Sequence, residues 1–183
     1  NARFLVPGVG FGGSCFPKDV RALVRASQDL NHDPALLKAV LLQNERQYLR
    51  AIELLEAELG DLKGRRIALL GLAFKGGTDD VRESRAVPIA EELLQKKATV
   101  VGYDPMANKE FRSLFPEIHL TNSLREALRD AEGCILQADW PEFTRLGAED
   151  FRETMRTPVV VDGRRILDPA AMKGLRFRRI GEP

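Results

Sequence analysis

A cysteine stands directly after a glycine-rich stretch near the start of the chain, in GVGFGGSCFPKDVRAL at residues 8–23. Glycines lack a Cβ atom, so they leave backbone groups open to close approach by another molecule. Cys15 therefore lies beside open backbone donors, and Lys18 and Asp19 add a cation and a carboxylate shortly after it. Because the thiolate is the form that attacks electrophiles and a nearby cation favours it, this arrangement makes Cys15 a candidate nucleophile, with a thiol that does no chemistry as the alternative.

The second cysteine, Cys134, lies within GCILQAD, a stretch that predicts a buried strand. A free cysteine in such a strand packs as a small hydrophobic residue, so we expect Cys134 to be structural. Two cysteines in a chain of this size do not form a disulfide framework, and free thiols favour a reducing, cytoplasmic location. The two histidines, His32 and His119, stand far apart in the sequence, and we expect no metal site.

A second glycine-bearing stretch carries cations where a parallel sheet binds ligands. GLAFKGGTDDVRES, at residues 71–84, follows a predicted strand and precedes a predicted helix, where free amides and the helix dipole attract phosphate. The stretch departs from GxGxxG and is longer than a dinucleotide-binding turn, but its Lys75 and Arg82 suit a diphosphate. A solvated basic loop is the alternative interpretation.

Asp104, Arg164 and Arg165 stand at the predicted carboxyl ends of two other strands. Open α/β sheets bind their ligands at that edge. Asp104 is a candidate to meet a ribose, although acidic residues are common at strand ends. An arginine after VVVDG could form a bidentate contact with a phosphate, or it could simply lie in solvent.

The bulk composition is that of an ordinary globular protein, with 30% charged and 44% hydrophobic residues and a formal net charge of +1. This balance gives no general argument for nucleic acid, despite the basic stretch LRFRRI near the end. No apolar run approaches the roughly 18 residues that a membrane span needs, so no membrane partner is expected. The apolar FLVP at residues 4–7 leads abruptly into the glycine motif and indicates a fragment of a longer protein.

Two helices are predicted ahead of the sheet, the first over residues 19–30. Asp33 and Pro34 then supply an N-cap and a first helical residue for a longer helix over 34–59, which Gly60 ends. One face of this helix repeats at spacings of three or four: Leu37, Leu41, Asn44, Tyr48, Ile52, Leu55 and Leu59. At about 39 Å it is longer than a small domain needs, so we interpret it as a connector that also packs against a partner chain. A core helix within one chain is the alternative.

From Lys63 onward, short β-rich runs alternate with helical segments. Strands are expected at residues 65–74, 98–105, 118–121, 133–139, 158–167 and 175–181, and helices at 84–97 and 123–131. This alternation implies right-handed βαβ crossovers and a parallel sheet covered on both faces. The predicted fold class is α/β, with a helical segment over 1–60 that carries the cysteine loop and a Rossmann-like domain over 61–183.

Several motifs occur in order along the chain: PG before GFGGSCFPKD, then GLAFKGGTDDVRES, YDP, WPEF and DGRRILDP. Together they resemble the nucleotide-sugar 6-dehydrogenases of the UDP-glucose/GDP-mannose dehydrogenase family, over essentially the whole chain. The resemblance implies that residues 1–60 are the remainder of a central helical dimerisation domain and that 61–183 bind a UDP-sugar. The family's NAD-binding Rossmann domain would precede both and has no counterpart in this sequence.

The resemblance implies oxidation of a sugar C6 alcohol to a carboxylate, with two NAD reduced. Cys15 would capture the intermediate aldehyde as a thiohemiacetal, and a second oxidation would give a thioester that water hydrolyses. Asp19 resembles the residue that helps to activate that water. Its alternative role is to cap the helix that is predicted to begin there.

The same resemblance implies a set of binding residues. The family's substrate loop, where small residues let backbone groups approach the sugar, is matched by Val6, Pro7, Gly8, Val9, Gly10, Phe11 and Gly12. Positions that contact the UDP part are matched by Phe74, Lys75 and Arg164. Positions that reach or border NAD are matched by Cys15, Phe16, Lys18 and Arg82.

The sequence PGVGFGGSCFPKD is more similar to the UDP-glucose members of the family than to the GDP-mannose members, so UDP-glucose is the expected substrate. GDP-mannose or another nucleotide-sugar is the runner-up. The chain departs from the family at QADW, residues 137–140, where threonine and glutamate are more frequent before WPEF. A homodimer through the helix 34–59 is the expected assembly. A non-catalytic nucleotide-binding or dimerisation module is the alternative of another class, and an exposed nucleophile argues against it.

Overall fold

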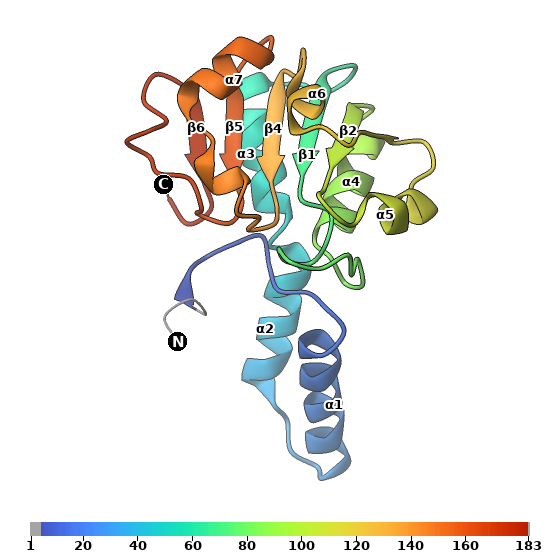
Figure 1. The fold of residues 1–183 in the computed structure, drawn as a ribbon. Helices are drawn as coiled ribbons and strands as arrows, with labels where there is room; N and C mark the ends of the chain where they lie inside the picture. The colour runs from blue at the N-terminus through green and yellow to red at the C-terminus, as the bar shows by residue number, and fades with distance from the viewer. Residues whose placement is uncertain (1–4, 183) are drawn as a thin grey trace.

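A computed structural model describes residues 5–182, as a sheet-bearing body with a helical arm projecting from it (Figure 1). The helices α1 (Phe16–Asp29) and α2 (Ala35–Arg46) make up the arm. In Figure 1 the strands point toward the arm, so the carboxyl edge of the sheet faces it. Within residues 5–182, no helix is long and apolar enough to cross a membrane.

The body contains one sheet of six parallel strands in the order β3-β2-β1-β4-β5-β6, which confirms the predicted α/β fold class. The strands are β1 (Arg66–Leu70), β2 (Thr99–Tyr103), β3 (His119–Leu120), β4 (Gly133–Leu136), β5 (Val159–Asp162) and β6 (Arg176–Arg179). Several are shorter than predicted, because their last apolar residues belong to the loops at the carboxyl edge. The strand order reverses between β1 and β4, the place where open α/β sheets bind ligands.

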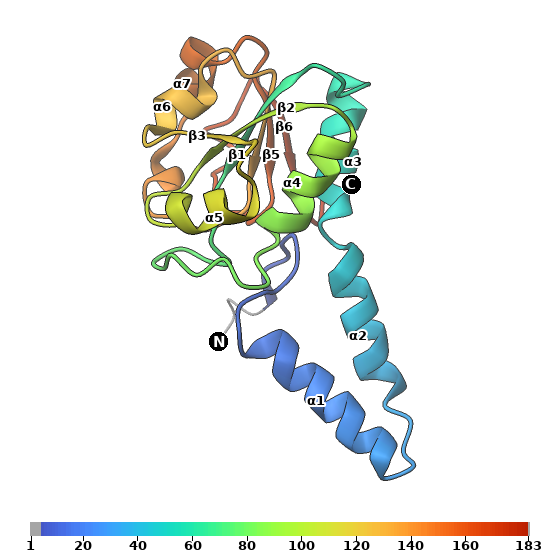
Figure 2. The ribbon, with the colours of Figure 1, turned by 90° about the vertical axis from the view of Figure 1, so that its right-hand side faces the viewer.

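The remaining helices cover the two faces of the sheet (Figure 2). They are α3 (Leu49–Leu59), α4 (Ala86–Gln95), α5 (Asn108–Leu114), α6 (Leu124–Leu128) and α7 (Ala148–Thr154), with a 3₁₀ turn at Phe143–Arg145. Neither α5 nor α7 was predicted from the sequence. Each has seven residues and buries a single large side chain, Phe111 or Phe151, so neither has enough residues to show a helical period.

The predicted long helix is present as α2 and α3, joined at Gln47 and Tyr48, whose φ and ψ angles stay helical. At the junction Arg50 and Ala51 donate to carbonyls three residues back, as in a 3₁₀ turn. The two halves differ in burial. The α2 half buries only Asn44, whereas α3 buries five side chains against the sheet: Ala51, Ile52, Leu54, Leu55 and Leu59. The connector interpretation therefore describes α2, and the alternative of a core helix describes α3.

The first helix begins earlier than predicted, at Phe16 rather than Asp19. Pro17 lies in its first turn, where a missing N–H costs nothing, and Asp19 N donates to Cys15 O at 2.8 Å. The alternative that Asp19 caps this helix is therefore wrong. Cys15 is the residue that precedes the helix.

Helix α3 lies directly on the sheet at Gly133, the first residue of β4. A Cβ atom there would stand 2.6 Å from Leu55 Cδ1, so the absence of a side chain at Gly133 leaves room for this leucine. Leu55 is fully buried in the cluster that α3 and α4 form with this face of the sheet. The packing of Leu55 at Gly133 helps to set the distance between the long helix and the sheet.

We expect Leu55→Ala to lower the free energy of unfolding by about 2–5 kcal/mol, because it leaves a cavity between α3 and β4. Leu114→Ala is the matched control, since Leu114 is 51% exposed, and it should change stability by less than about 0.5 kcal/mol. Urea denaturation of both variants measures the difference. Equal losses would contradict the placement of α3 in the core.

Candidate functional site

The cysteine loop, residues 6–15, crosses the carboxyl edge of the sheet before α1 begins (Figure 1). Its backbone is bonded to two loops of the body. Val9 N donates to Gly163 O, after β5, at 3.1 Å, and Gly13 N donates to Arg82 O, between β1 and α4, also at 3.1 Å. Val9 itself is fully buried. The loop is thus held on the body at two separate points.

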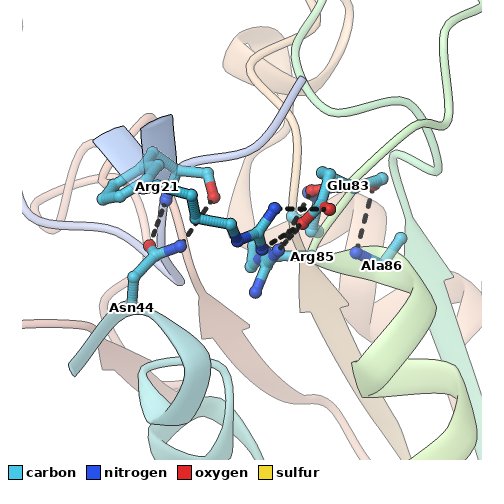
Figure 3. Close-up of polar contacts among 8 residues, drawn as sticks. Arg21, Asn44, Glu83, Arg85 and Ala86 are labelled. Atoms are coloured by element: carbon cyan, nitrogen blue, oxygen red, sulfur yellow. Dashed lines mark hydrogen bonds and ion pairs between the residues drawn. The ribbon is translucent and has the colours of Figure 1, made fainter. Parts of the chain in front are cut away.

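Helix α2 holds the same loop from the opposite side (Figure 3). The Asn44 side chain accepts a hydrogen bond from Phe11 N at 2.7 Å and donates to Phe11 O at 3.1 Å. One turn later, Gln47 Nε2 donates to Gly8 O at 3.0 Å. The sequence placed Asn44 on the apolar face of this helix, and an amide in a buried stripe is the signal for such a clamp.

The glycines of the loop are needed for packing within the chain. A Cβ at Gly12 would overlap the carbonyl oxygen of Glu83, and one at Gly13 would lie 2.8 Å from the Phe74 ring. Gly10 has φ +112° and would place a Cβ 2.7 Å from Asn44 Oδ1. The glycine-rich sequence predicted the approach of another molecule, but at these three positions the groups that approach belong to the protein itself.

Cys15 is exposed and immediately precedes the first turn of α1. The positive end of the helix dipole lies there, next to the sulfur. Lys18 and Asp19 lie in the same first turn and pair with each other at 3.3 Å, with both side chains about two-thirds exposed (70% and 67%). Because Asp19 follows Cys15 by four residues, the two side chains share one face of the helix.

Two other predicted cofactor-bordering residues lie beside this turn. Phe16 packs edge-on against Phe11, with ring centroids 4.6 Å apart. Arg82 is exposed and its guanidinium bonds the Asp80 carboxylate, with the shortest distance 2.8 Å. The Asp80 hydrogen bond raises the pKa of Arg82, and the charge of the Cys15 thiolate acts in the same direction. Arg82 is joined to the cysteine loop by the hydrogen bond that Gly13 N donates to its carbonyl oxygen.

The residues predicted to contact UDP meet at the same edge. Phe74 packs against Gly13 of the cysteine loop, and the Lys75 Nζ stands 5.3 Å from the centre of the Phe74 ring. A Cβ at Gly8 would lie 3.6 Å from a guanidinium nitrogen of Arg164. The fold thus brings together residues from the loops after β1 and β5 and from the segment before α1.

Two candidates from the sequence have other roles. Asp104 is buried, and its two carboxylate oxygens accept five hydrogen bonds from within the chain, so none is directed at a ribose. Arg165 donates to Ile180 O at 3.2 Å and pairs with Glu182 at 3.6 Å, which ties the end of the chain to the body. Cys134 is fully buried in β4, as the sequence indicated, and burial raises the pKa of its thiol.

An ion cluster that no sequence pattern predicted joins α1 to the body (Figure 3). Arg21 of α1 donates to both carboxylate oxygens of Glu83, at 3.0 and 3.2 Å, and Arg85 donates to the same carboxylate at 3.2 Å. Glu83 has φ 52°, a left-handed conformation that is unfavourable for a residue with a side chain. The partners are 62 positions apart, so spacing along the chain could not reveal them.

Charge and burial act in opposite directions in this cluster. The hydrogen bond from Arg21 holds the pKa of Glu83 below its ordinary value. Burial lowers the pKa of Arg85, whose side chain is only 9% exposed, while the Glu83 carboxylate opposes that shift. The cluster therefore depends on Glu83 remaining ionised.

We expect Arg21→Ala to raise the pKa of Glu83 toward its ordinary value. The folded-state pKa of Glu83 is lowered, so the pair stabilises the fold at neutral pH and loses that contribution as pH falls through the folded-state pKa. Carbon-13 titration of the Glu83 carboxyl group measures the shift. Arg25→Ala, which removes an exposed pair with Asp29 on the same helix, should leave the Glu83 titration unchanged.

Comparison with known proteins groups these motifs in one family. The profile for the UDP binding domain of the UDP-glucose/GDP-mannose dehydrogenase family matches residues 68–169. The profile for the central domain of the same family matches residues 1–46. Together the two matches include both the cysteine loop and most of the sheet.

Individual relatives point to the same family. A UDP-glucose 6-dehydrogenase of Haloferax volcanii is 46% identical over 166 residues, which cover 91% of this chain and 38% of the relative. The structure of a UDP-glucose dehydrogenase from Pyrobaculum islandicum has a TM-score of 0.83 and 41% identity, covering 93% of this chain and 38% of that one. A GDP-mannose dehydrogenase from Pseudomonas aeruginosa has a TM-score of 0.79 and 29% identity, covering 98% and 42%.

The chain spans about two-fifths of the length of these relatives. The match to the UDP binding domain alone extends over more than half of the 183 residues. It includes the carboxyl end of β1 and all of β4 and β5, and the loops described above follow these strands. The chain therefore belongs to the UDP-glucose/GDP-mannose dehydrogenase family.

Proposed function

We propose that this chain is the sugar-nucleotide part of an NAD-dependent UDP-glucose 6-dehydrogenase, which oxidises UDP-glucose to UDP-glucuronate. The observation that carries the proposal is the common position of Cys15, Phe74 and Arg164 at one edge of the sheet. The cysteine loop packs against both of the other side chains, through Gly13 and Gly8. A nucleophile and a nucleotide site would then share one short segment of backbone.

Cys15 is the nucleophile in this proposal. Its thiolate adds to the carbonyl carbon of the sugar C6 aldehyde, which forms a C–S bond as the carbonyl π electrons move to oxygen and a proton follows. The thiohemiacetal keeps the reactive aldehyde attached to the protein. The position of Cys15 before α1 supports this role, because a helix N-terminus favours the thiolate.

Asp19 acts in the hydrolytic half of the reaction. Oxidation of the adduct leaves a thioester, and water attacks its carbonyl carbon while the C–S bond breaks and the Cys15 thiolate leaves. Asp19 accepts a proton from that water. Its position one turn after Cys15 supports this, and its exposed pair with Lys18 is of the weak kind that exchanges readily with solvent.

Three side chains bind the UDP part in this proposal: Phe74, Lys75 and Arg164. Lys75 and Arg164 supply two cations for the diphosphate, and the planar guanidinium adds the geometry for two parallel hydrogen bonds. The contact between Arg164 and Asp139 is long, at 3.9 Å. The substrate loop, from Val6 to Gly12, presents backbone groups to the sugar.

NAD supplies the hydride acceptor when it is bound. The four residues proposed to border it are all exposed in the structure: Cys15, Phe16, Lys18 and Arg82. Two of them are cations, which suits the pyrophosphate of a dinucleotide. The Gly13–Arg82 backbone bond joins Arg82 to the cysteine loop, where its guanidinium would orient the cofactor.

UDP-glucose is the preferred substrate because the identity to the UDP-glucose enzymes is higher, at 46% and 41%, than the 29% identity to the GDP-mannose enzyme. GDP-mannose is the second candidate. The relatives are more than twice as long as this chain, so the NAD-binding domain would belong to a further part of the protein. We propose a boundary between the helical segment and the UDP-binding domain at residues 60 and 61.

The helical arm is the proposed dimer contact, together with the rest of the helix 34–59. Large apolar side chains on α1 and α2 and the turn between them are exposed: Leu23, Leu30, Leu36, Val40 and Leu42. Exposed apolar groups of this kind gain free energy when a second surface covers them. A second copy of the chain is the proposed partner.

Calorimetric titration of the 183-residue chain with UDP, UDP-glucose, GDP-mannose and NAD tests the substrate assignment. We expect binding heat from UDP and UDP-glucose only. We also expect no NADH from UDP-glucose plus NAD, because the chain would supply only the sugar-nucleotide side of the active site and would position the reactants poorly. Binding of GDP-mannose instead would replace the substrate. Turnover by the chain alone would contradict the need for a further domain.

Alkylation with iodoacetamide tests the nucleophile. At neutral pH, Cys15 should react in the native chain several-fold faster than in the urea-unfolded chain, because unfolding removes the helix N-terminus that favours the thiolate. Cys134 should react only after opening, on the order of 100-fold more slowly than when unfolded. Peptide mapping separates the two sites. A Cys15 rate that is equal in both states would favour a binding module without chemistry.

A further inference from the structure

Asp104, at the carboxyl end of β2, is the most heavily hydrogen-bonded carboxylate in the described part of the chain. It is 1% exposed. Oδ1 accepts from Met106 N and Ala107 N, both at 2.9 Å. Oδ2 accepts from Leu72 N at 2.7 Å, Ala73 N at 3.1 Å and Trp140 Nε1 at 3.0 Å. A buried charge is tolerated when hydrogen bonds replace its hydration, and five donors do so here.

The three donors on Oδ2 come from two loops on either side of the point where strand order reverses. Leu72 and Ala73 follow β1 and immediately precede Phe74 and Lys75. Trp140 follows β4. One oxygen atom therefore sets the distance between the exits of two adjacent strands, β1 and β4, whose pairing in the sheet ends at Leu70 and Leu136.

The two loops meet again at Gly76. Gly76 N donates to Asp139 Oδ1 at 3.0 Å, and a Cβ at Gly76 would lie 2.7 Å from Asp139 O. Asp139 also lies 3.9 Å from Arg164. Residues 72–76 and 139–140 thus form a closed ring of contacts that begins and ends at Asp104.

We propose that Asp104 is a positioning residue for nucleotide binding, which holds the Phe74–Lys75 segment at a fixed place relative to Arg164. The inference rests on the proposed function for its ligand. Asp104 does not touch the nucleotide, since its acceptors face inward to backbone and indole donors. This positioning role takes the place of the ribose contact that the sequence suggested for Asp104.

The chemistry of a carboxylate is required for this role. An asparagine has the same shape but one acceptor oxygen and one NH₂ group. In either orientation the NH₂ group would face two or three N–H donors, which have no other acceptor in this ring. The segment before Phe74 would then lose the interaction that fixes it, while the sheet itself keeps its strand pairing.

Trp140 provides a direct reporter, because it is the only tryptophan in the chain. Its indole N–H donates to Asp104, so a nitrogen-15 spectrum contains one indole signal that reports this bond. In Asp104→Asn we expect that signal to shift, the Leu72 and Ala73 amides to exchange faster with solvent, and the Kd for UDP to rise about tenfold. A second variant, Trp140→Phe, removes one donor only and should raise Kd by about threefold.

Leu55→Ala is the control for stability alone, because it weakens the core on the α3 side without touching the ring. Its UDP affinity should stay within about twofold of the original chain at a temperature where it is folded. If Asp104→Asn and Trp140→Phe, both folded by circular dichroism, bind UDP as tightly as the original chain, the inference is wrong. If the original chain binds no UDP, the proposed nucleotide site fails first and the inference falls with it.

Discussion

Gly12 lies so close to Glu83 that any side chain would overlap the Glu83 carbonyl oxygen, and the position of the thiol depends on this contact. The cysteine loop belongs to no strand and lies between an arm and a sheet edge. It stays in place because its backbone is bonded on both sides, to Gly163 and Arg82 of the body and to Asn44 of the long helix. Without glycine at this position, that double attachment could not form.

Buried carboxylates give the sheet edge its shape. Asp104 after β2 and Asp162 at the end of β5 both direct their oxygens at backbone N–H groups of the following loop. Burial raises the pKa of Asp162, and the backbone hydrogen bonds oppose that shift. Asp162 orders the turn that carries Arg164 in the same way that Asp104 orders the segment before Phe74. The loops at this edge are therefore built on internal acceptors rather than on packing alone.

Sequence patterns predicted the parts of the fold that depend on long apolar runs. The strands predicted over 65–74 and 133–139 occur in shorter form as β1 and β4, and the helix predicted over 34–59 occurs as α2 and α3, because buried strands and amphipathic helices leave recognisable apolar patterns. The seven-residue helix at Asn108–Leu114 leaves none. The beginning of α1 was misplaced because Pro17 is as compatible with a first helical turn as with a loop, and only the bond from Asp19 N to Cys15 O decides between them.

The candidate site was predictable where its residues belong to a sequence motif and unpredictable where its contacts join segments that are distant along the chain. Cys15, Phe74 and Arg164 were selected as candidates from their motifs, and the fold brings their segments together. The direction of Asp104 was not predictable, because an aspartate at a strand end can face a ligand or the backbone with the same sequence around it. Arg21 and Glu83 had no signal, since an ion pair between distant segments has no spacing rule.

The long helix connects the arm, the loop and the core in one element. Its α3 half is buried on β4, its α2 half is exposed, and the two residues that hold the cysteine loop, Asn44 and Gln47, lie at the transition between them. A bend at the junction would therefore move Phe11 and Gly8 together with the arm. The α3 half is held in place by its packing in the core, where Leu55 is fully buried. The position of the thiol relative to the sheet is thus set by the same helix that extends away from the sheet.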